Sequence, residues 1–317
     1  MTANTDGVAA TLRSVDAQWL VRGWLSSNNV IFAAGDDGAA VVDTGYSSHA
    51  AQTRALVSRA LAGRPLARIV NSHLHSDHCG GNAELARVWP GLRTAVPIGY
   101  RASVQPWDES RLSFQRCDQR CEAFEVDNFL QPGATIRLGH RHWEIHATPG
   151  HDPDAVVFFE PQSAVLISAD ALWEDRLAII FPELVGESGF DAAHAALDLI
   201  ERLAPRLVLP GHGAAFTGVA AALRASRSRL DAFAAAPGKH RLHAARALVS
   251  YHMLELQQLD REALIQWIVE TPIFLDALQC AGDPVLARRL AEETVERLMA
   301  DGVLRPQGDM LEMVIRS

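Results

Sequence analysis

Residues 71–82 read Asn71-Ser72-His73-Leu74-His75-Ser76-Asp77-His78-Cys79-Gly80-Gly81-Asn82, and they carry four metal-capable side chains within six positions. The apolar run Leu66-Ala67-Arg68-Ile69-Val70 precedes them and is typical of a buried strand. Because residues i and i+2 of an extended segment share a face, His73 and His75 can point at one ion. Asp77 and His78 follow in a tight turn and can face a second ion. Imidazole and carboxylate groups are the ligands that zinc and similar divalent ions take.

The overall composition is that of an ordinary globular protein. The chain has 317 residues, of which 48% are hydrophobic and 21% charged, and this length allows one large domain plus a smaller one. No apolar run reaches the roughly 18 residues of a transmembrane helix, and residues 1–7 lack the features of a secretion signal. We therefore expect a cytoplasmic protein with no membrane partner. The net charge of −9 disfavours nucleic acid as a partner.

Apolar runs and turn residues along the rest of the chain predict a mixture of strands and helices. Strands are expected at residues 19–24, 29–33, 39–43, 66–72, 94–98, 135–138, 143–147, 155–159, 164–170 and 206–209. Helices are expected at residues 48–62, 190–203, 218–236, 241–256, 261–269 and 284–300. Residues 1–14 read as a loose lead-in. The Pro237-Gly238 pair predicts a domain boundary, with domains at residues 1–237 and 238–317.

Residues 99–130 are less regular than their surroundings and carry several aromatic side chains. These are Trp107, Phe114, Phe124 and Phe129. An aromatic insertion between motif elements can form a lid over a substrate site, or it can form a local hydrophobic plug. The sequence leaves both alternatives open.

The four cysteines are too few and too scattered for a disulfide scaffold. Cys117 and Cys121 lie one helical turn apart, and a zinc site there would need two further ligands that the neighbouring sequence does not offer. Cys79 either lines the pocket beside the metal motif or packs behind its turn.

Candidate metal ligands stand at the ends of four different predicted strands. They are His73, His75, Asp77, His78, His151, Asp170 and His212. Because a rigid sheet holds the loops at its strand ends close together, these side chains can converge. Two ions need three ligands each, and the set divides into His73, His75 and His151 on one side and Asp77, His78 and His212 on the other. Asp170, which has two carboxylate oxygens, is then the natural bridge.

With these residues in this order, the chain resembles the metallo-β-lactamase superfamily over about residues 15–235. The family's ordered motifs match Asp43, the His73/His75/Asp77/His78 signature, His151, Asp170 and His212. The resemblance implies an α/β fold, a four-layered αβ/βα sandwich of two mixed sheets with a dimetal cleft along one edge. It also implies that Asp43 steadies the ligand loop through hydrogen bonds. The implied cofactors are two divalent ions, zinc first, with iron and manganese also suited to these ligands.

Branches of this superfamily differ at the position of Asp170. The β-lactamases carry cysteine there, whereas an aspartate is similar to glyoxalase II, the lactonases, the thioesterases and the RNA-processing members. The segment Asp152-Pro153-Asp154 departs from glyoxalase II, which usually has threonine or serine and then small residues after the histidine. The resemblance therefore implies a dimetal hydrolase that cleaves a small acyl substrate (a thioester, ester or lactone) with a metal-bound hydroxide. Asp77 is its expected catalytic residue, because it would orient that hydroxide.

Two other activities of the same fold stay open. One is phosphodiester cleavage, as in an endoribonuclease. The other is a mononuclear-iron, persulfide dioxygenase-like reaction, which needs two histidines and one carboxylate. The presence of Asp77, His78 and His212 favours two metals over one.

An apolar stretch after Asp170 can form a substrate wall or simply pack in the core. It contains Trp173, Leu177, Ile179, Ile180 and Phe181. In the same way, Asp152 and Asp154 either serve the turn before the next strand or contact substrate.

Beyond Pro237, three helices and a hairpin at residues 303–314 resemble the winged-helix tail found on one branch of the superfamily. Residues 239–317 carry nine Lys or Arg against twelve Asp or Glu, so this winged-helix-like tail is acidic where a nucleic-acid wing is normally basic. Residues 216–250 are locally positive, which a solvated helix face or a dimer contact explains. We expect the tail to pack over the edge of the active site, where it shapes the pocket or forms a homodimer interface.

Overall fold

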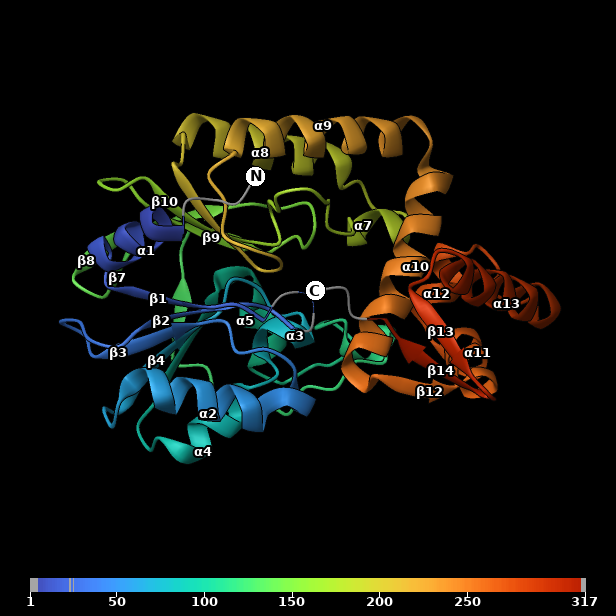
Figure 1. Cartoon of the computed structure of the whole chain (residues 1–317), viewed down its shortest axis with the longest axis horizontal. Helices are drawn as coiled ribbons and strands as arrows, with labels where there is room; N and C mark the ends of the chain where they lie inside the picture. Colours follow the sequence, from blue (N-terminus) through green and yellow to red (C-terminus); the bar gives the residue numbers. More distant parts are fainter. Residues whose placement is uncertain (1–4, 23, 25, 315–317) are drawn as a thin grey trace.

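Two facing β-sheets form the centre of the molecule (Figure 1). The computed structural model describes residues 5–22, 24 and 26–314. The first sheet has the order β1 (Ala17–Leu20), β2 (Asn29–Phe32), β3 (Ala39–Val42), β4 (Leu66–Val70), β5 (Arg93–Pro97) and β6 (Asn128–Leu130). The second has the order β11 (Leu207–Pro210), β10 (Val165–Ala169), β9 (Val156–Glu160), β8 (Arg141–Ala147) and β7 (Thr135–Leu138). Both sheets are mixed. The parallel pairs are β3–β4, β4–β5 and β5–β6 in the first sheet and β10–β11 in the second.

Side chains of the central strands are buried on both faces, which explains their almost continuous apolar runs. In β9, Phe158 points into the core between the sheets, whereas Val157 and Phe159 face the opposite way, into a second core beneath helices. In β2, Phe32 likewise lies between the sheets and Ile31 lies beneath helices on the other side. The period-two alternation of a strand thus feeds two separate cores from one segment.

Helices cover the outer face of each sheet, so the domain has four layers (Figure 1). The first sheet is covered by α2 (Ala50–Leu61) and α4 (Asn82–Val88), and the second by α8 (Phe190–Leu203) and α9 (Val219–Ala235). The predicted αβ/βα sandwich is confirmed. Helix α9 is amphipathic enough to pack Leu223 and Leu230 against the sheet while its outer face stays exposed.

The parallel pairs bring distant loops to one edge of the sandwich. Val42 at the end of β3 pairs with Val70 at the end of β4, so the residues that follow these two strands are neighbours. In the second sheet, Ala169 of β10 pairs with Pro210 of β11. The main-chain N–H of Val156 donates a hydrogen bond to the main-chain carbonyl of Ser72 at 2.9 Å, and this bond connects the edges of the two sheets. Candidate ligands that follow these strands therefore share one rim.

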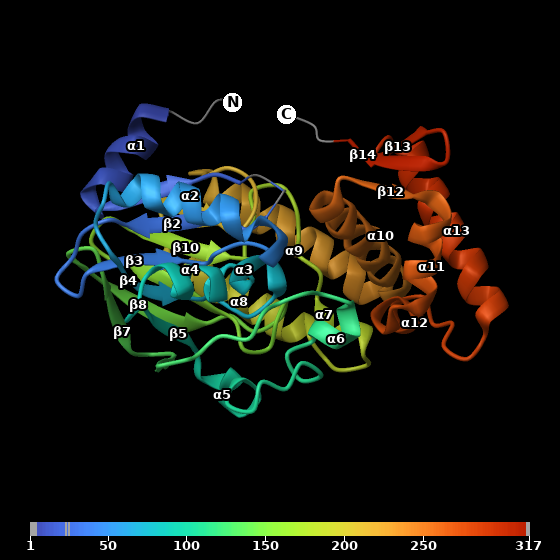
Figure 2. The same cartoon turned by 90° about the horizontal axis from the view of Figure 1, so that it is seen from below.

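The C-terminal elements lie at one end of the sandwich, beside this rim (Figure 2). They are α10 (Pro237–Leu256), β12 (Gln258–Asp260), α11 (Arg261–Glu270), α12 (Pro272–Ala277), α13 (Pro284–Ala300), β13 (Leu304–Gln307) and β14 (Met310–Met313). The three strands form a separate sheet of order β12-β14-β13. Their core also includes Ile179 and Leu184 from before the predicted boundary. The division at residue 237 and the winged-helix assignment stay predictions.

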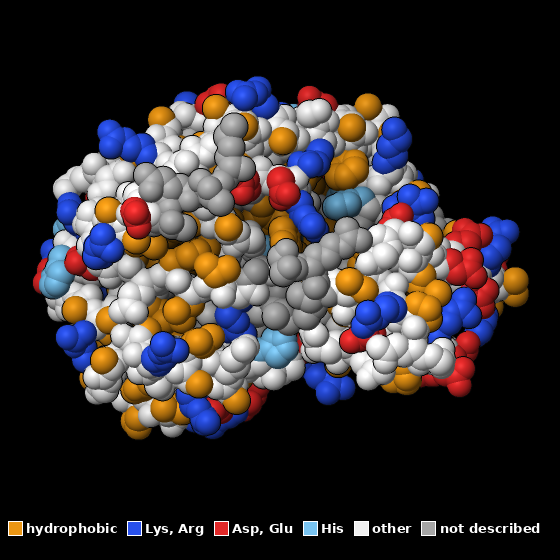
Figure 3. Space-filling model, viewed as in Figure 1, with side chains coloured by type: hydrophobic (Ala, Val, Ile, Leu, Met, Phe, Trp, Pro, Cys, Tyr) orange, Lys and Arg blue, Asp and Glu red, His pale blue; other side chains and the backbone are white. Residues whose placement is uncertain are grey.

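Between the sandwich and the C-terminal elements, the surface is hollowed, with apolar side chains in the hollow (Figure 3). No helix among the described residues has both the length and the apolar character needed to cross a membrane.

Two predictions at the N-terminus were wrong. Residues 5–14, expected as a loose lead-in, form α1 (Thr5–Ser14), because Val8 and Leu12, one turn apart, pack against the core between the sheets; residues 1–4 lie outside the described part. The strand expected at 19–24 lies instead at Ala17–Leu20, where it pairs with β2. Gly23, within the expected range, is not among the described residues.

Residues 99–130 form a hydrophobic cluster behind the metal motif. Phe114 and Trp107 belong to it together with Leu74 and Cys79 of the motif, which agrees with the plug alternative for these aromatics. The short helices here are α5 (Arg101–Val104) and α6 (Phe114–Cys117). Because α6 ends at Cys117, Cys117 and Cys121 do not share a helix face. The Cys121 thiol lies 3.6 Å from that of Cys79, and both are free.

We expect the Phe158→Ala substitution to lower the free energy of unfolding by about 3–5 kcal/mol, because it leaves a cavity between the sheets. Phe158 is fully buried. Urea denaturation monitored by circular dichroism measures the change, and Val285→Ala on the exposed side of α13 is the control. A loss below about 1 kcal/mol for Phe158→Ala would show that this region collapses around the missing ring.

Candidate metal centre

The loop after β4 delivers four candidate ligands through one extended segment and one helical turn. His73 and His75 lie on the extended part, and α3 (Ser76–Cys79) then places Asp77 and His78 on the following turn. All four are buried. A hydrogen bond stabilises this turn, because the Asn71 side chain donates to the main-chain carbonyl of His78 at 3.0 Å.

Glycines allow this packing. A Cβ at Gly80 would come within 2.3 Å of the Ser47 backbone nitrogen, and one at Gly211 within 2.1 Å of an Asp170 carboxylate oxygen. The first of these neighbours is backbone, and the second is the carboxylate of a candidate ligand. Glycine is therefore needed at residues 80, 81 and 211 because other groups pack closely against their backbone, and not only because the chain bends there.

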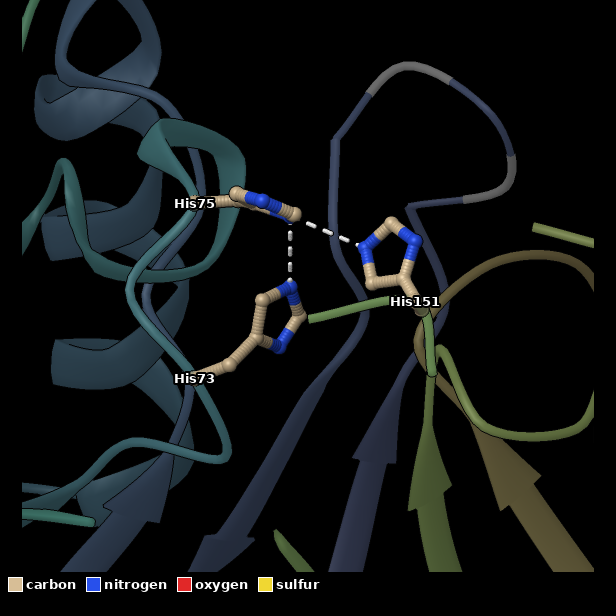
Figure 4. Close-up of side chains that lie close together, drawn as sticks. All are labelled: His73, His75 and His151. Carbon is tan, nitrogen blue, oxygen red and sulfur yellow. Dashed lines mark hydrogen bonds between the residues drawn. The ribbon is translucent and has the colours of Figure 1, made fainter. Parts of the chain in front are cut away.

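One group of three ligands converges as predicted: His73, His75 and His151 (Figure 4). The His75 Nδ1 atom lies 3.0 Å from His73 Nε2 and 2.9 Å from His151 Nε2. The imidazole of His151 reaches across from the loop after β8, so this group joins the two sheets.

The second predicted group also converges: Asp77, His78 and His212. Asp77 Oδ2 lies 3.0 Å from His212 Nε2 and 3.7 Å from His78 Nε2. Between the groups, Asp170 Oδ1 lies 3.3 Å from His78 Nε2, and its Oδ2 lies 3.4 Å from His151 Nε2. One carboxylate thus touches both groups, which is the arrangement of a bridging ligand.

Asp43, at the end of β3, holds two of these histidines. Its carboxylate accepts from the backbone N–H and the hydroxyl of Ser72, at 2.9 and 2.7 Å, and its Oδ2 lies 2.8 Å from His78 Nδ1. Because the Ser72 hydroxyl proton goes to Asp43, the His73 Nδ1 atom, 3.1 Å from that hydroxyl, must be the donor. The Nε2 atom of His73 is then left with a lone pair that points into the centre, and so is the Nε2 atom of His78 whenever that imidazole is neutral.

His151 is oriented in the same way by the chain after β10. Its Nδ1 lies 2.7 Å from the Ile179 carbonyl, which can only accept, so its Nε2 also carries a lone pair. His75 Nε2 faces the carboxylate of Asp152 at 3.7 Å, an ion-pair distance that is too long for a direct hydrogen bond. Tyr100 donates to the same carboxylate. Asp152 also accepts from the backbone of Asp154, so it serves its own turn and faces a candidate ligand.

The donor set fits divalent metal ions. His73 and His151 both direct lone pairs at His75 Nδ1, which carries at most one proton and cannot satisfy both. The Nε2 atoms of His78 and His212 are buried without a hydrogen-bond partner among the described residues. Although His212 Nε2 lies close to Asp77, the two do not have hydrogen-bond geometry. Cations between these groups would satisfy every such atom.

Electrostatics support the same conclusion. Burial lowers the pKa of His75 and of His151 to about 4, so both are neutral and able to bind metal at neutral pH. Burial also opposes charge on His78, but the carboxylates of Asp170, Asp77 and Asp43 outweigh it and raise the pKa of this imidazole well above its usual value. The carboxylate-rich half of the centre thus attracts a positive charge, either a proton or a metal ion.

A pocket opens directly over the candidate ligands. Its lining consists of Tyr46, His75, Asp77, Gln119, His151, Asp170, Trp173, Ile179, Phe181, Leu248 and Tyr251. Trp173, Ile179 and Phe181 come from the stretch predicted as a substrate wall, whereas Leu177 and Ile180 of that stretch pack beside α8. Cys79 does not line the pocket but packs behind the turn.

Helix α10 contributes to this region in two ways that the sequence did not reveal. Leu248 and Tyr251 line the pocket. His240 accepts a hydrogen bond from the backbone N–H of Ile180 at 3.1 Å, next to the Ile179 carbonyl that holds His151. The two residues are 60 positions apart in the chain. The sequence around His240 predicts a helix but gives no indication of this contact.

Comparison with known proteins agrees with this geometry. A family model described as the metallo-beta-lactamase superfamily matches residues 22–212. The chain belongs to the metallo-beta-lactamase superfamily. Among solved structures, a beta-lactamase domain protein from Burkholderia ambifaria aligns over 94% of this chain and 92% of its own, with a TM-score of 0.57 and 20% identity. This likeness shows the fold.

Curated relatives are named as hydrolases. The human acyl-coenzyme A thioesterase MBLAC2 is 27% identical over 203 residues, which cover 61% of this chain and 71% of that protein. The hydroxyacylglutathione hydrolase of Legionella pneumophila (strain Corby) is 26% identical over 178 residues, which cover 56% of this chain and 59% of that protein. The prediction of a hydrolase of this superfamily is confirmed.

We expect Asp43→Asn to weaken metal binding by about 10- to 100-fold, because His78 and Ser72 lose a charged acceptor. Competition with a chelating dye of known affinity measures the change. Asp191→Asn, at the exposed start of α8, is the matched control. An unchanged affinity in Asp43→Asn would mean that this carboxylate does not orient the ligand loop.

His240 should make the fold sensitive to acid. Burial, followed by the charges of His243 and Arg241, lowers the pKa of His240 to about 4 from its ordinary 6.5. Between these values the unfolded chain binds more protons, so stability falls as the pH drops from 6.5 towards 4, by at most about 3 kcal/mol for this group. His240→Gln keeps an acceptor for Ile180 and does not titrate. Urea denaturation at pH 7 and pH 5 should show a smaller loss in the variant, and parallel losses would contradict the assignment.

Proposed function

We propose that this protein hydrolyses the thioester of a small acyl compound, with two divalent ions held by the seven predicted ligands. The observation that carries the proposal is the pair of three-ligand groups joined by Asp170 in the wall of one pocket. Thioesters are preferred to the other acyl compounds because the relatives' names describe hydrolysis of acyl compounds of coenzyme A and of glutathione.

The ligand chemistry suits zinc first, and also iron or manganese. Bound divalent ions would lower the pKa of a coordinated water and polarise the substrate carbonyl. His73, His75 and His151 would hold the ion nearest Phe181, whose ring lies 4.7 Å from that of His75. Asp77, His78 and His212 would hold the other, with Asp170 between the two.

Asp77 is the expected catalytic residue. Its Oδ2 faces His212 and His78, and the carboxylate also lines the pocket. Burial opposes its ionisation, but the neighbouring His78 and His212 hold the pKa of Asp77 below its usual value. An ionised Asp77 can accept a hydrogen bond from the attacking water and turn a lone pair of that water towards the carbonyl carbon.

Two phenols face the same space. Burial and the charges of Asp77 and Asp170 raise the pKa of Tyr46 and of Tyr251 well above the usual value. Both hydroxyls therefore stay protonated at neutral pH and can donate a hydrogen bond to a substrate oxygen. Trp173, Ile179 and Leu248 complete the wall and would exclude bulk water from the acyl group.

Metal-replete protein should hydrolyse at least one member of a panel of acyl thioesters, aryl esters and lactones, with thioesters turned over best. His75→Ala and Asp170→Ala should each abolish the activity, because each removes a ligand. His142→Ala, on an exposed part of β8, is the control. Elemental analysis should find two divalent ions per chain.

The alternative activities give different outcomes in the same assays. A preparation that hydrolyses no acyl compound but cuts single-stranded RNA would replace this proposal by phosphodiester cleavage. One iron per chain, with oxygen consumed in the presence of a persulfide, would replace it by the dioxygenase-like reaction.

A further inference from the structure

A chain of polar contacts runs from the segment after β5 to the candidate ligand His75. Tyr100 is the last residue of the short 3₁₀-helix η2 (Ile98–Tyr100), which directly follows β5. Its hydroxyl donates to Asp152 Oδ1 at 2.5 Å, and the other oxygen of that carboxylate lies 3.7 Å from His75 Nε2. All three side chains are buried. Because Tyr100 follows a strand of the first sheet and Asp152 a strand of the second, these contacts join the two halves of the rim.

Chemistry fixes the direction of each hydrogen bond in this chain. The main-chain N–H of Leu74 donates to the Tyr100 hydroxyl at 3.3 Å, so the hydroxyl is the acceptor there and its own proton goes to Asp152. Asp152 Oδ1 also accepts from the main-chain N–H of Asp154 at 2.8 Å. Two donors thus hold one oxygen of the carboxylate, and the other oxygen is left to face His75.

The surroundings of Tyr100 hold its hydroxyl in this place. The ring packs in the hydrophobic cluster behind the metal motif, together with Leu74 and Cys79. A Cβ at Gly99 would lie 1.8 Å from a carboxylate oxygen of Asp154. The glycine therefore allows η2 to approach the turn that carries Asp152 without displacing the Asp154 side chain.

His75 has a central place among the candidate ligands. Its Nδ1 lies 3.0 Å from His73 Nε2 and 2.9 Å from His151 Nε2 (Figure 4). A neutral imidazole carries one proton, and the nitrogen that holds this proton cannot bind a metal ion. The negative charge of Asp152 beside Nε2 favours the proton on that nitrogen. The Nδ1 lone pair is then available to an ion that His73 and His151 also bind.

We propose that Tyr100 is a positioning residue for His75. It holds the Asp152 carboxylate against His75 Nε2, and in this way it strengthens the binding of the ion that His73, His75 and His151 would share. This inference uses the two ions of the proposed function and does not depend on the substrate.

The effect of Tyr100 should be confined to one of the two ions. Among the described residues, neither Tyr100 nor Asp152 forms a hydrogen bond or ion pair with a member of the second group of ligands, which consists of Asp77, His78 and His212. A general loss of stability would weaken both ions, so the selectivity distinguishes positioning from a merely structural role.

Tyr100→Phe removes the hydroxyl and keeps the ring. Zinc titration of metal-free full-length protein, in competition with a chelating dye, should show one binding event weakened by about tenfold and the other unchanged. In His151→Ala, which removes a ligand of the first group, the remaining event should have the same affinity with and without Tyr100→Phe. Ile145→Val, which removes one methylene from the core between the sheets, is the control for lost stability and should change neither event.

Asp152→Asn tests the route by which Tyr100 acts. Asparagine keeps an acceptor for the phenol but lacks the charge that faces His75, so it should weaken the same binding event. If Tyr100 acts through Asp152, adding Tyr100→Phe to Asp152→Asn should lower the affinity by no more than about twofold further. Additive losses in the double variant would overturn this route.

The outcomes separate the role of Tyr100 from the proposed function. Equal weakening of both ions by Tyr100→Phe, or of neither, overturns the positioning role and leaves thioester hydrolysis standing. If the wild type binds one ion only, an affinity that Tyr100→Phe does not change overturns the role in the same way. Wild-type protein that binds two ions but hydrolyses no thioester contradicts the proposed function alone.

Nitrogen NMR of the metal-free protein gives a readout without any ion. His75 should be protonated on Nε2 in the wild type and partly on Nδ1 in Tyr100→Phe, because the carboxylate of Asp152 is no longer held against Nε2. An identical distribution of the proton in the two proteins would overturn the role of Tyr100, even if the wild type bound no zinc and the proposed function had failed.

Discussion

Imidazole and carboxylate groups from four loops are buried together within a few ångströms, and this crowding is the constraint on which the rest of the structure depends. Removing such groups from water costs free energy unless a charge of opposite sign or a hydrogen bond compensates each of them. Hydrogen bonds satisfy the Nδ1 atoms of His73, His78 and His151. Their Nε2 atoms face the other candidate ligands. Cations are the compensation that fits, so a metal ion bound here would also stabilise the fold of this rim.

The need to bring these buried groups together accounts for the presence of two facing sheets. The ligand loop after β4 belongs to the first sheet, while Asp170 and His212 follow strands of the second. Both three-residue groups, His73/His75/His151 and Asp77/His78/His212, combine residues that follow strands of the two sheets. The inner core at Phe158 and its neighbours fixes the distance between the sheets, and the Val156–Ser72 hydrogen bond fixes their edges. Precision at the rim therefore comes from packing well beneath it.

Helix α10 forms part of the wall of the pocket over the candidate metal ligands. It supplies Leu248 and Tyr251 to the wall and supports the Ile179–Ile180 segment through His240. The locally positive residues 216–250 were interpreted from the sequence as a solvated face or a dimer contact. In the structure Arg227 of α9 is paired with Asp198 and Glu201 of α8, while Arg229 and Arg246 form no ion pair with a described residue.

The sequence by itself predicted the cluster of candidate metal ligands, which depends on local patterns, and its resemblance to the superfamily implied the layered fold. The His-x-His-x-Asp-His spacing, the apolar strands and the residues that end them are each readable within a few positions. Only the tertiary structure decided the contacts of Asp152 with His75, of His240 with Ile180 and of Arg176 with Trp24, and it also showed that residues 5–14 are helical. These contacts join residues distant in the chain through side chains that have no characteristic spacing. Which residues meet depends on how the two sheets and α10 pack together. This packing involves many segments and cannot be predicted from any one of them.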